Sequence, residues 1–192
     1  MAGPKRGIYL QAQALIEFDL RIKRGAAEDE DLQLIDGAAT FSELTPFHGV
    51  YTQRIPGDHG AAVDISLALL RQAVEARIQI GIRRIPATGL SLSLSCFVSR
   101  IRQEIKLFDG VVDKPGNLGV VDKPGNLENS FVVAVVVKSP LALKFKVARA
   151  DDMGNAVHRF RGYPARVHGR NLDSIPLDFG TIEVQVSWAN LD

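Results

Sequence analysis

The stretch Val74-Glu-Ala-Arg-Ile-Gln-Ile-Gly-Ile82 places an apolar residue at every second position and a polar residue or glycine between them. Successive side chains of a β-strand point to opposite faces, so this alternation predicts a strand with one buried and one solvated face. Leu90–Phe97, in which leucines alternate with serines, and the terminal segment Thr181–Trp188 repeat the pattern. Alternation of this kind indicates an all-β protein.

Further segments complete the predicted fold. The same alternation occurs in Leu15–Lys23, Val63–Leu69, Arg100–Phe108 and Leu141–Val147. Phe131–Lys138 is apolar on both faces, which predicts a central strand or a strand with one face at an interface. With closely spaced Gly and Pro connectors, the pattern predicts eight or nine strands in an antiparallel β-sandwich with few or no helices. A closed or flattened β-barrel is the alternative fold. Residues 68–78 contain several helix formers, so a helix is an alternative to a strand in that segment.

The bulk composition bounds the class of protein. The 192 residues carry a net charge of +1 and are 46% hydrophobic, which predicts one domain over residues 1–192 with a proper core. A nearly neutral chain has no general electrostatic affinity for nucleic acid. Cys96 is the single cysteine, so no intrachain disulfide can form, and we expect a small buried hydrophobe. The sequence shows no signal-peptide pattern, which favours a cytoplasmic protein without a membrane partner.

One segment is duplicated in tandem. Gly110-Val-Val-Asp-Lys-Pro-Gly-Asn-Leu118 is followed at once by an identical copy, Gly119–Leu127. Solenoid repeats are longer than nine residues and need several copies. Pro-Gly-Asn is turn chemistry, so residues 110–127 are interpreted as a lengthened loop.

No motif for catalysis, metal binding or a cofactor stands out. The sequence has no phosphate-binding glycine loop, metal-ligand spacing or nucleophile elbow. Asp58-His59 lies within a turn-forming Pro-Gly-Asp-His-Gly sequence without a marked nucleophile. The acidic runs Glu28–Asp31 and Asp151-Asp152 are interpreted as solvated loops rather than calcium sites. We therefore predict no catalytic residue, no metal, no cofactor and no enzyme activity.

The segment from His158 to Arg170 differs electrostatically from the rest of the chain. It contains four arginines, two histidines and two aromatic residues but no acidic residue. Arginines with interleaved aromatic residues suit RNA phosphates and stacked bases, although a solvated strand and loop explain the composition equally well. The candidate contact residues for a nucleic acid or another partner are Arg159, Arg161, Tyr163, Arg166 and Arg170.

Four segments together resemble a known family. They are Gly3-Pro-Lys-Arg-Gly7, Ile16-Glu-Phe-Asp-Leu-Arg-Ile-Lys23, Ala73-Val-Glu-Ala-Arg-Ile78 and Gly180-Thr-Ile-Glu-Val-Gln-Val-Ser-Trp188. They resemble a domain of unknown function abundant in grasses, which occurs alone or C-terminal to a ribosome-inactivating domain, as in the large jasmonate-induced protein of cereals. The resemblance implies a setting in plant stress or defence. It also implies one or two further strands upstream of the Gly-Pro-x-Arg-Gly segment.

The resemblance raises the question of N-glycosidase activity. The ribosome-inactivating active site carries Glu-Ala-Ala-Arg on a helix, which brings both charged side chains to one face. Glu75-Ala76-Arg77 is one residue shorter and lies in a strand-like pattern, so we predict no such activity. The sequence therefore predicts a non-catalytic interaction or accessory module in plant defence, with an unidentified protein partner. A module that binds RNA or the ribosome is the alternative.

Overall fold

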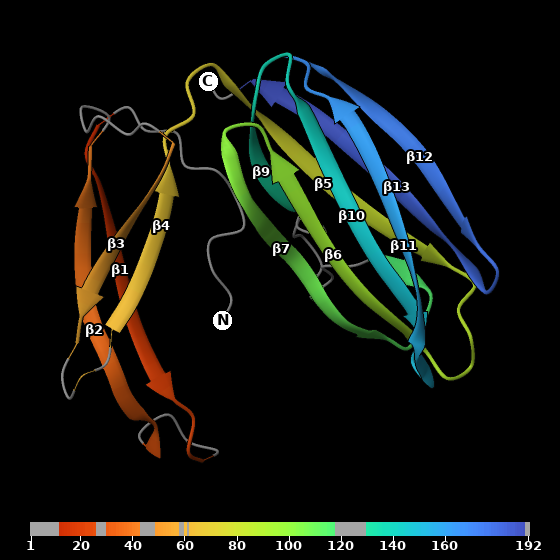
Figure 1. Ribbon diagram of the computed structural model, residues 1–192, viewed down its shortest axis with the longest axis horizontal. Coiled ribbons are helices and arrows are strands. Elements are labelled where there is room, and N and C mark those ends of the chain that lie inside the picture. Colours follow the sequence, from red (N-terminus) through yellow and green to blue (C-terminus); the bar gives the residue numbers. More distant parts are fainter. Residues whose placement is uncertain are drawn as a thin grey trace, which may run out of the picture. The chain divides into compact units, whose positions relative to one another are not determined.

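The structure is a computed structural model that describes residues 12–25, 30–42, 49–57, 60, 62–117 and 130–190. Within these residues the chain forms thirteen strands in four antiparallel sheets and contains no α-helix. The strands divide into two compact units, one formed by β1 to β4 and the other by β5 to β13 (Figure 1). The predicted all-β class is confirmed.

The larger unit is built from two sheets. Sheet 1 has the strand order β11-β10-β6-β7, and sheet 2 has the order β12-β13-β5, with β8 and β9 both on the remaining edge of β5. Sheet 1 comprises β6 (Leu90–Val98), β7 (Ile101–Val112), β10 (Pro140–Arg149) and β11 (Asp152–Pro164). Sheet 2 comprises β5 (Ala73–Arg83), β8 (Gly116–Asn117), β9 (Phe131–Val136), β12 (Gly169–Leu177) and β13 (Gly180–Asn190).

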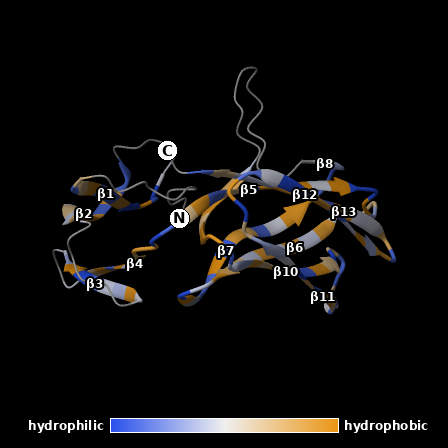
Figure 2. Ribbon diagram, turned by 90° about the horizontal axis from the view of Figure 1, so that it is seen from above, coloured by the Kyte–Doolittle hydropathy of each residue, from blue (hydrophilic) through white to orange (hydrophobic). Residues whose placement is uncertain are grey.

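The two sheets enclose the main hydrophobic core. In Figure 2 they lie as two layers, with β5, β12 and β13 in one and β6, β7, β10 and β11 in the other. On β5 every apolar residue of the alternating stretch from Val74 to Ile82 is buried. The facing side chains include Leu94 of β6 and Phe145 of β10, both fully buried. Two sheets that pack their apolar faces together form a β-sandwich, as the alternation predicted.

The smaller unit consists of two hairpins. β1 (Ala14–Ile22) pairs with β2 (Leu32–Phe41), and β3 (Val50–Pro56) pairs with β4 (Ala62–Ala68). Among its described residues, the buried apolar ones all lie on β2: Ile35, Ala39 and Phe41.

The structure corrects the predicted number of strands. Thirteen strands occur among the described residues rather than eight or nine, and five of them were not expected: β2, β3, β8, β11 and β12. The alternative of a helix over residues 68–78 is wrong, because β4 ends at Ala68 and a turn with Gln72 at φ 54° leads into β5. None of the sheets closes on itself within the described residues, which favours the sandwich over the barrel.

Two special segments lie at the edge of sheet 2. Among the described strands β9 pairs only with β5, so it is an edge strand rather than a central one. It buries Phe131, Val133 and Val135, while the residues between them are half-buried. In the duplicated segment, Gly110 to Val112 end β7 and Gly116-Asn117 form β8, whereas residues 118–127 lie outside the described part of the chain.

Candidate functional site

The five residues predicted to contact a partner do not share one surface. Arg159, Arg161 and Tyr163 occupy alternate positions on β11, and because Tyr163 is buried, all three side chains point to the inward side of that strand. Arg166 follows β11 and is exposed. Arg170 pairs with Ser187, which places it on the outward face of sheet 2. The structure brings Arg161 and Tyr163 together and leaves Arg170 on a different surface.

Arg161 and Tyr163 converge on one carboxylate. Asp173 Oδ2 lies 2.8 Å from Arg161 Nε, and it accepts a hydrogen bond of 3.2 Å from the Tyr163 hydroxyl. Burial, followed by the nearby charge of Asp173, raises the pKa of Tyr163 above its ordinary value, so the hydroxyl stays protonated and donates. Because β11 and β12 belong to opposite sheets, these contacts join the two sheets at one edge of the sandwich. Two of the five predicted contact residues therefore have a structural role.

The remaining basic residues have fewer protein contacts. Arg159 is half-buried, and its Nη1 donates to the carbonyl oxygen of His158 at 3.1 Å. No carboxylate forms an ion pair with Arg166 or Arg170 among the residues that the structure describes. These two side chains are exposed and remain available to a ligand.

A groove crosses the outward face of sheet 2. Its volume is about 690 Å³, and it lies over β5, β13 and β12. The lining residues, which define the sheet 2 groove, are Gln79, Gly81, Leu172, Asp173, Ser174, Glu183, Val184 and Gln185. They combine amide, hydroxyl and carboxylate groups with one exposed leucine.

Strand register explains why these residues meet. Gln79 pairs with Gln185, and Gly81 pairs with Glu183, so two cross-strand pairs lie next to each other on the solvated face. Gly81 has no side chain and is buried, so beside Glu183 the lining is formed without a side chain from β5. On the other side of β13, Leu172 of β12 pairs with Gln185, so Gln79, Gln185 and Leu172 lie in one row across three strands. The polar residues of neighbouring alternating strands thus form one continuous polar surface.

Hydrogen bonds orient the side chains of the sheet 2 groove. Gln185 Nε2 donates to Gln79 Oε1 at 2.8 Å and to Ser187 Oγ at 3.4 Å. Arg83 Nε donates to Glu183 Oε2 at 3.0 Å, which neutralises the carboxylate charge. Within the described residues no protein partner binds Gln79 Nε2, Gln185 Oε1 or the Ser174 hydroxyl. The two amide side chains are therefore held in fixed orientations, with the amino group of Gln79 and the oxygen of Gln185 unused within the described residues.

Sequence reasoning did not find this groove. The two glutamines lie 106 positions apart, and their meeting depends on the pairing of β5 with β13. The only signal in the sequence was an amide at the centre of each wet strand face. Such a signal identifies a site only when the strand order and register are known.

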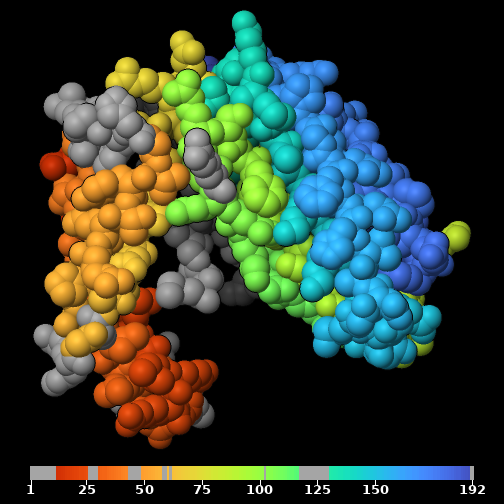
Figure 3. All heavy atoms as spheres, in the orientation of Figure 1, coloured from red at the N-terminus to blue at the C-terminus, as the bar shows by residue number. Residues whose placement is uncertain are grey.

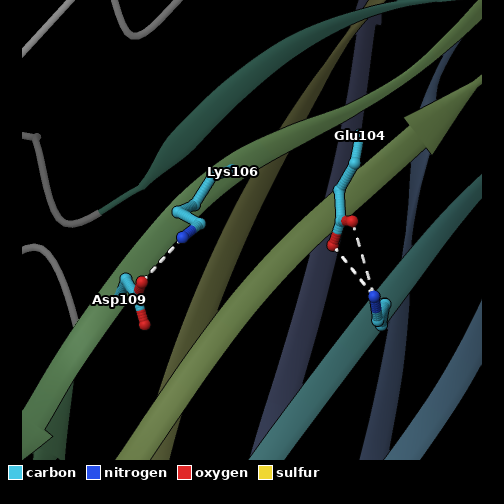
Figure 4. A network of polar contacts seen from close by, with 4 residues as sticks. Glu104, Lys106 and Asp109 are labelled. Atoms are coloured by element: carbon cyan, nitrogen blue, oxygen red, sulfur yellow. Dashed lines mark hydrogen bonds and ion pairs between the residues drawn. The ribbon is translucent and has the colours of Figure 1, made fainter.

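The outward face of sheet 1 is polar as well, but two oppositely charged pairs occupy part of it. This face is toward the viewer in Figure 3, from green β6 and β7 to light blue β11. Lys144 Nζ lies 3.2 Å from Glu104, and Lys106 Nζ lies 2.7 Å from Asp109 (Figure 4). A hydrogen bond from Ser95, followed by that from Lys144, lowers the pKa of Glu104. These groups satisfy each other and make the face a weaker candidate than the groove.

The residues considered in the sequence as candidates for catalysis or metal binding do not form a second candidate site within the described part of the chain. Glu75 and Arg77 share the outward face of β5 and lie 3.4 Å apart, as the strand interpretation required. Asp151 pairs with Arg149, and Asp152 accepts a hydrogen bond from Asn155. No cluster of three potential metal ligands occurs in the described part of the chain. Residues 26–29 and 58–59, and with them Asp58-His59, lie outside that part.

The fold and the groove define a β-sandwich protein with a polar groove on the outward face of one sheet. The chain belongs to the DUF6598 family, a domain of unknown function, which matches residues 1–186. No curated protein and no solved structure matches the chain. The resemblance to a domain of unknown function is thus confirmed at the level of the family. A separate finding is that the described residues contain no helix of the length and apolar character needed to cross a membrane.

Proposed function

We propose that the chain is a non-catalytic binding module that holds a partner against the sheet 2 groove. The observation that carries this proposal is the set of oriented polar atoms on Gln79, Gln185 and Ser174 that have no protein partner among the described residues. Polar groups at protein surfaces that are fixed in this way lose little side-chain entropy when a ligand binds. Such preorganisation supports binding.

The chemistry of the groove favours binding over catalysis. Amide side chains neither accept nor release protons in the ordinary pH range, so Gln79 and Gln185 are unsuited to general acid–base work. The carboxylate of Glu183 is held by Arg83 and is half-exposed. Cys96 is a buried thiol whose pKa burial raises to about 12, which makes it a poor nucleophile.

A comparison of groove variants tests the proposal. The chain is immobilised as the wild type, as Gln79→Ala and as Gln103→Ala, and each is exposed to an extract of stressed plant tissue. Gln103 is a matched control because it is an exposed glutamine on β7 of the opposite sheet. We expect the wild type and Gln103→Ala to retain the same partner and Gln79→Ala to lose it. Equal retention by all three, or chemical turnover of the retained partner, would contradict the proposal.

The family resemblance supports a more specific setting. We propose an accessory module in plant stress or defence that acts in the cytoplasm, beside or fused to a ribosome-inactivating domain, with a protein as its partner. Fractionation of tissue before and after jasmonate treatment tests the setting, and induced accumulation in the cytosolic fraction is expected. A depurination assay on ribosomes tests the absence of N-glycosidase activity, because aniline-dependent cleavage of rRNA would show the opposite.

Binding to RNA or to the ribosome is the second candidate, supported by Arg166 and Arg170, which are exposed and form no ion pair with any other residue that the structure describes. It predicts that affinity falls with added salt and that Arg166→Ala and Arg170→Ala each reduce the salt dependence. Arg161 is less suited to this role because it is paired with Asp173. Binding that ignores salt, or no RNA binding at low salt, would remove this candidate.

A further inference from the structure

The two amides of the sheet 2 groove are arranged so that each retains one free hydrogen-bonding group. Gln79 Oε1 is occupied by the bond from Gln185, which leaves the two N–H groups of Gln79 Nε2. Gln185 Nε2 is occupied by Gln79 and Ser187, which leaves the Oε1 lone pairs of Gln185. A donor and an acceptor thus lie side by side on one sheet face. A ligand hydroxyl group both donates and accepts, so a ligand with several hydroxyl groups matches this array.

The charge of the groove indicates a neutral ligand. The one carboxylate whose outward position lies in the groove, Glu183, is paired with Arg83 at 3.0 Å. Asp173, whose backbone also borders the groove, directs its carboxylate to Arg161 and Tyr163 between the sheets. The lining contains no cation that could hold a phosphate or sulfate group. The exposed Arg170, which pairs with Ser187 one row beyond Gln185, lies outside this lining, so electrostatic complementarity within the lining favours an uncharged partner over an anionic one.

The groove also offers an apolar contact beside the polar row. Leu172 is 68% exposed and pairs directly with Gln185 across the β12–β13 ladder. Gly81 lines the groove without a side chain but is buried, so Leu172 is the exposed apolar group of the lining. A sugar ring presents C–H groups on its face and hydroxyl groups at its edge. Leu172 would contact the face while the two amides bind the edge.

An extended peptide fits this surface less well. A peptide that adds to a sheet uses the free backbone groups of an edge strand. β13 lies between β12 and β5 and is paired on both sides over the groove, whereas β12 is the edge strand of sheet 2 on that side. A peptide that adds to β12 would lie beside the sheet, in its plane, whereas a ligand in the groove lies over the face of the sheet and meets side chains.

From these observations we propose that the sheet 2 groove binds a neutral oligosaccharide, such as a glycan chain carried by the partner. The inference rests on the proposed binding function and narrows it to one class of ligand. Gln79 and Gln185 supply the donor and the acceptor, Ser174 adds a hydroxyl group, and Leu172 packs against a sugar ring.

A glycan panel tests the inference with the intact chain. Immobilised neutral β-glucans, xylans, mannans and N-linked glycans are compared with sulfated glycans and with RNA, and the strongest binder is titrated by calorimetry. Gln79→Ala and Gln185→Ala are each expected to weaken binding about tenfold, because each removes one hydrogen bond to the ligand. Leu172→Asn is expected to weaken it severalfold, and Gln103→Ala is expected to leave it unchanged.

The fold of each variant is checked by urea unfolding, followed by the fluorescence of Trp188, the single tryptophan, which is buried. Leu172→Asn guards against misfolding because position 172 is exposed. The inference is supported if the chain binds a neutral glycan, if added salt does not change the affinity, and if the groove variants bind more weakly. Binding of sulfated glycans alone, or affinity that all groove variants retain, overturns it. If no neutral glycan binds but Gln79→Ala still loses a non-glycosylated partner from tissue extract, this inference fails and the proposed binding function stands.

Discussion

The carboxylate of Asp173 joins the edge strands of the two sheets, and its removal is expected to loosen the sandwich. Its oxygens contact Arg161 Nε at 2.8 Å, the Tyr163 hydroxyl at 3.2 Å and the backbone N–H of Ser174 at 2.8 Å. The substitution Asp173→Ala removes all three contacts. We expect it to lower the free energy of unfolding without changing the fold.

The magnitude follows from the burial of each partner. Tyr163 is only 5% exposed, and leaving its hydroxyl unpaired costs about 1–3 kcal/mol. The side chains of Arg161 and Asp173 are 33% and 31% exposed, so solvent screening limits their ion pair to about 0–1 kcal/mol. We therefore expect a loss of about 2 kcal/mol in total. For a chain of this size, that loss corresponds to a decrease in Tm of about 4–8 °C.

The assay is urea unfolding followed by the fluorescence of the buried Trp188. Asp178→Ala is the matched control because Asp178 is an exposed carboxylate in the turn after β12. A double-mutant cycle with Tyr163→Phe should give a coupling energy of about 0.5–1.5 kcal/mol. The reasoning is refuted if Asp173→Ala is as stable as the control, or if the effects at positions 163 and 173 are additive.

Three further predictions concern the core and the outward face of sheet 1. Burial raises the pKa of Cys96 to about 12, so a thiol reagent at pH 8 should label the chain only in urea; rapid labelling of the native chain would contradict this. Ser95→Ala should raise the carboxyl pKa of Glu104 more than Lys144→Gln does, measured by ¹³C NMR titration, because Ser95 is the larger cause of its lowered pKa. In the wild type the stabilisation from Glu104 is present above its unfolded pKa and lost as pH falls through the lower folded pKa. Phe145→Ala should cost about 3–5 kcal/mol in urea unfolding, since Phe145 is fully buried between the sheets.

The alternating strands of the core could be predicted from the sequence because each one pairs a buried face with a solvated face. On β5 the residues from Val74 to Ile82 follow this rule throughout, and all the apolar ones are buried. β2 was missed because Gly37, Ala38 and Ala39 interrupt the contrast between polar and apolar positions. Small residues fit a strand without giving a periodic signal.

β11 was missed for a different reason. Its inward positions include Arg159 and Arg161, which are charged and only half-buried because the strand lies at the edge of sheet 1. The pattern therefore appears polar on both faces. The same arginines were predicted to contact a ligand, yet the partner of Arg161 is Asp173 on the opposite sheet. Strand order, which local sequence does not encode, decides between these two roles.

The groove depends on strand order in the same way. Gln79 and Gln185 are unremarkable residues on separate wet faces until β13 pairs with β5 in the observed register. A shift of one residue would turn each glutamine toward the core.

Photo-crosslinking from each face of the sandwich tests most directly whether the outward face of sheet 2 holds the partner. A photoreactive phenylalanine derivative replaces either Leu172 over the groove or Phe160 on the outward face of sheet 1, which are 68% and 59% exposed. We predict that irradiation in tissue extract links the partner to position 172 and not to position 160. Crosslinks from position 160 alone, or equal crosslinks from both positions, would contradict the assignment of the groove as the binding surface.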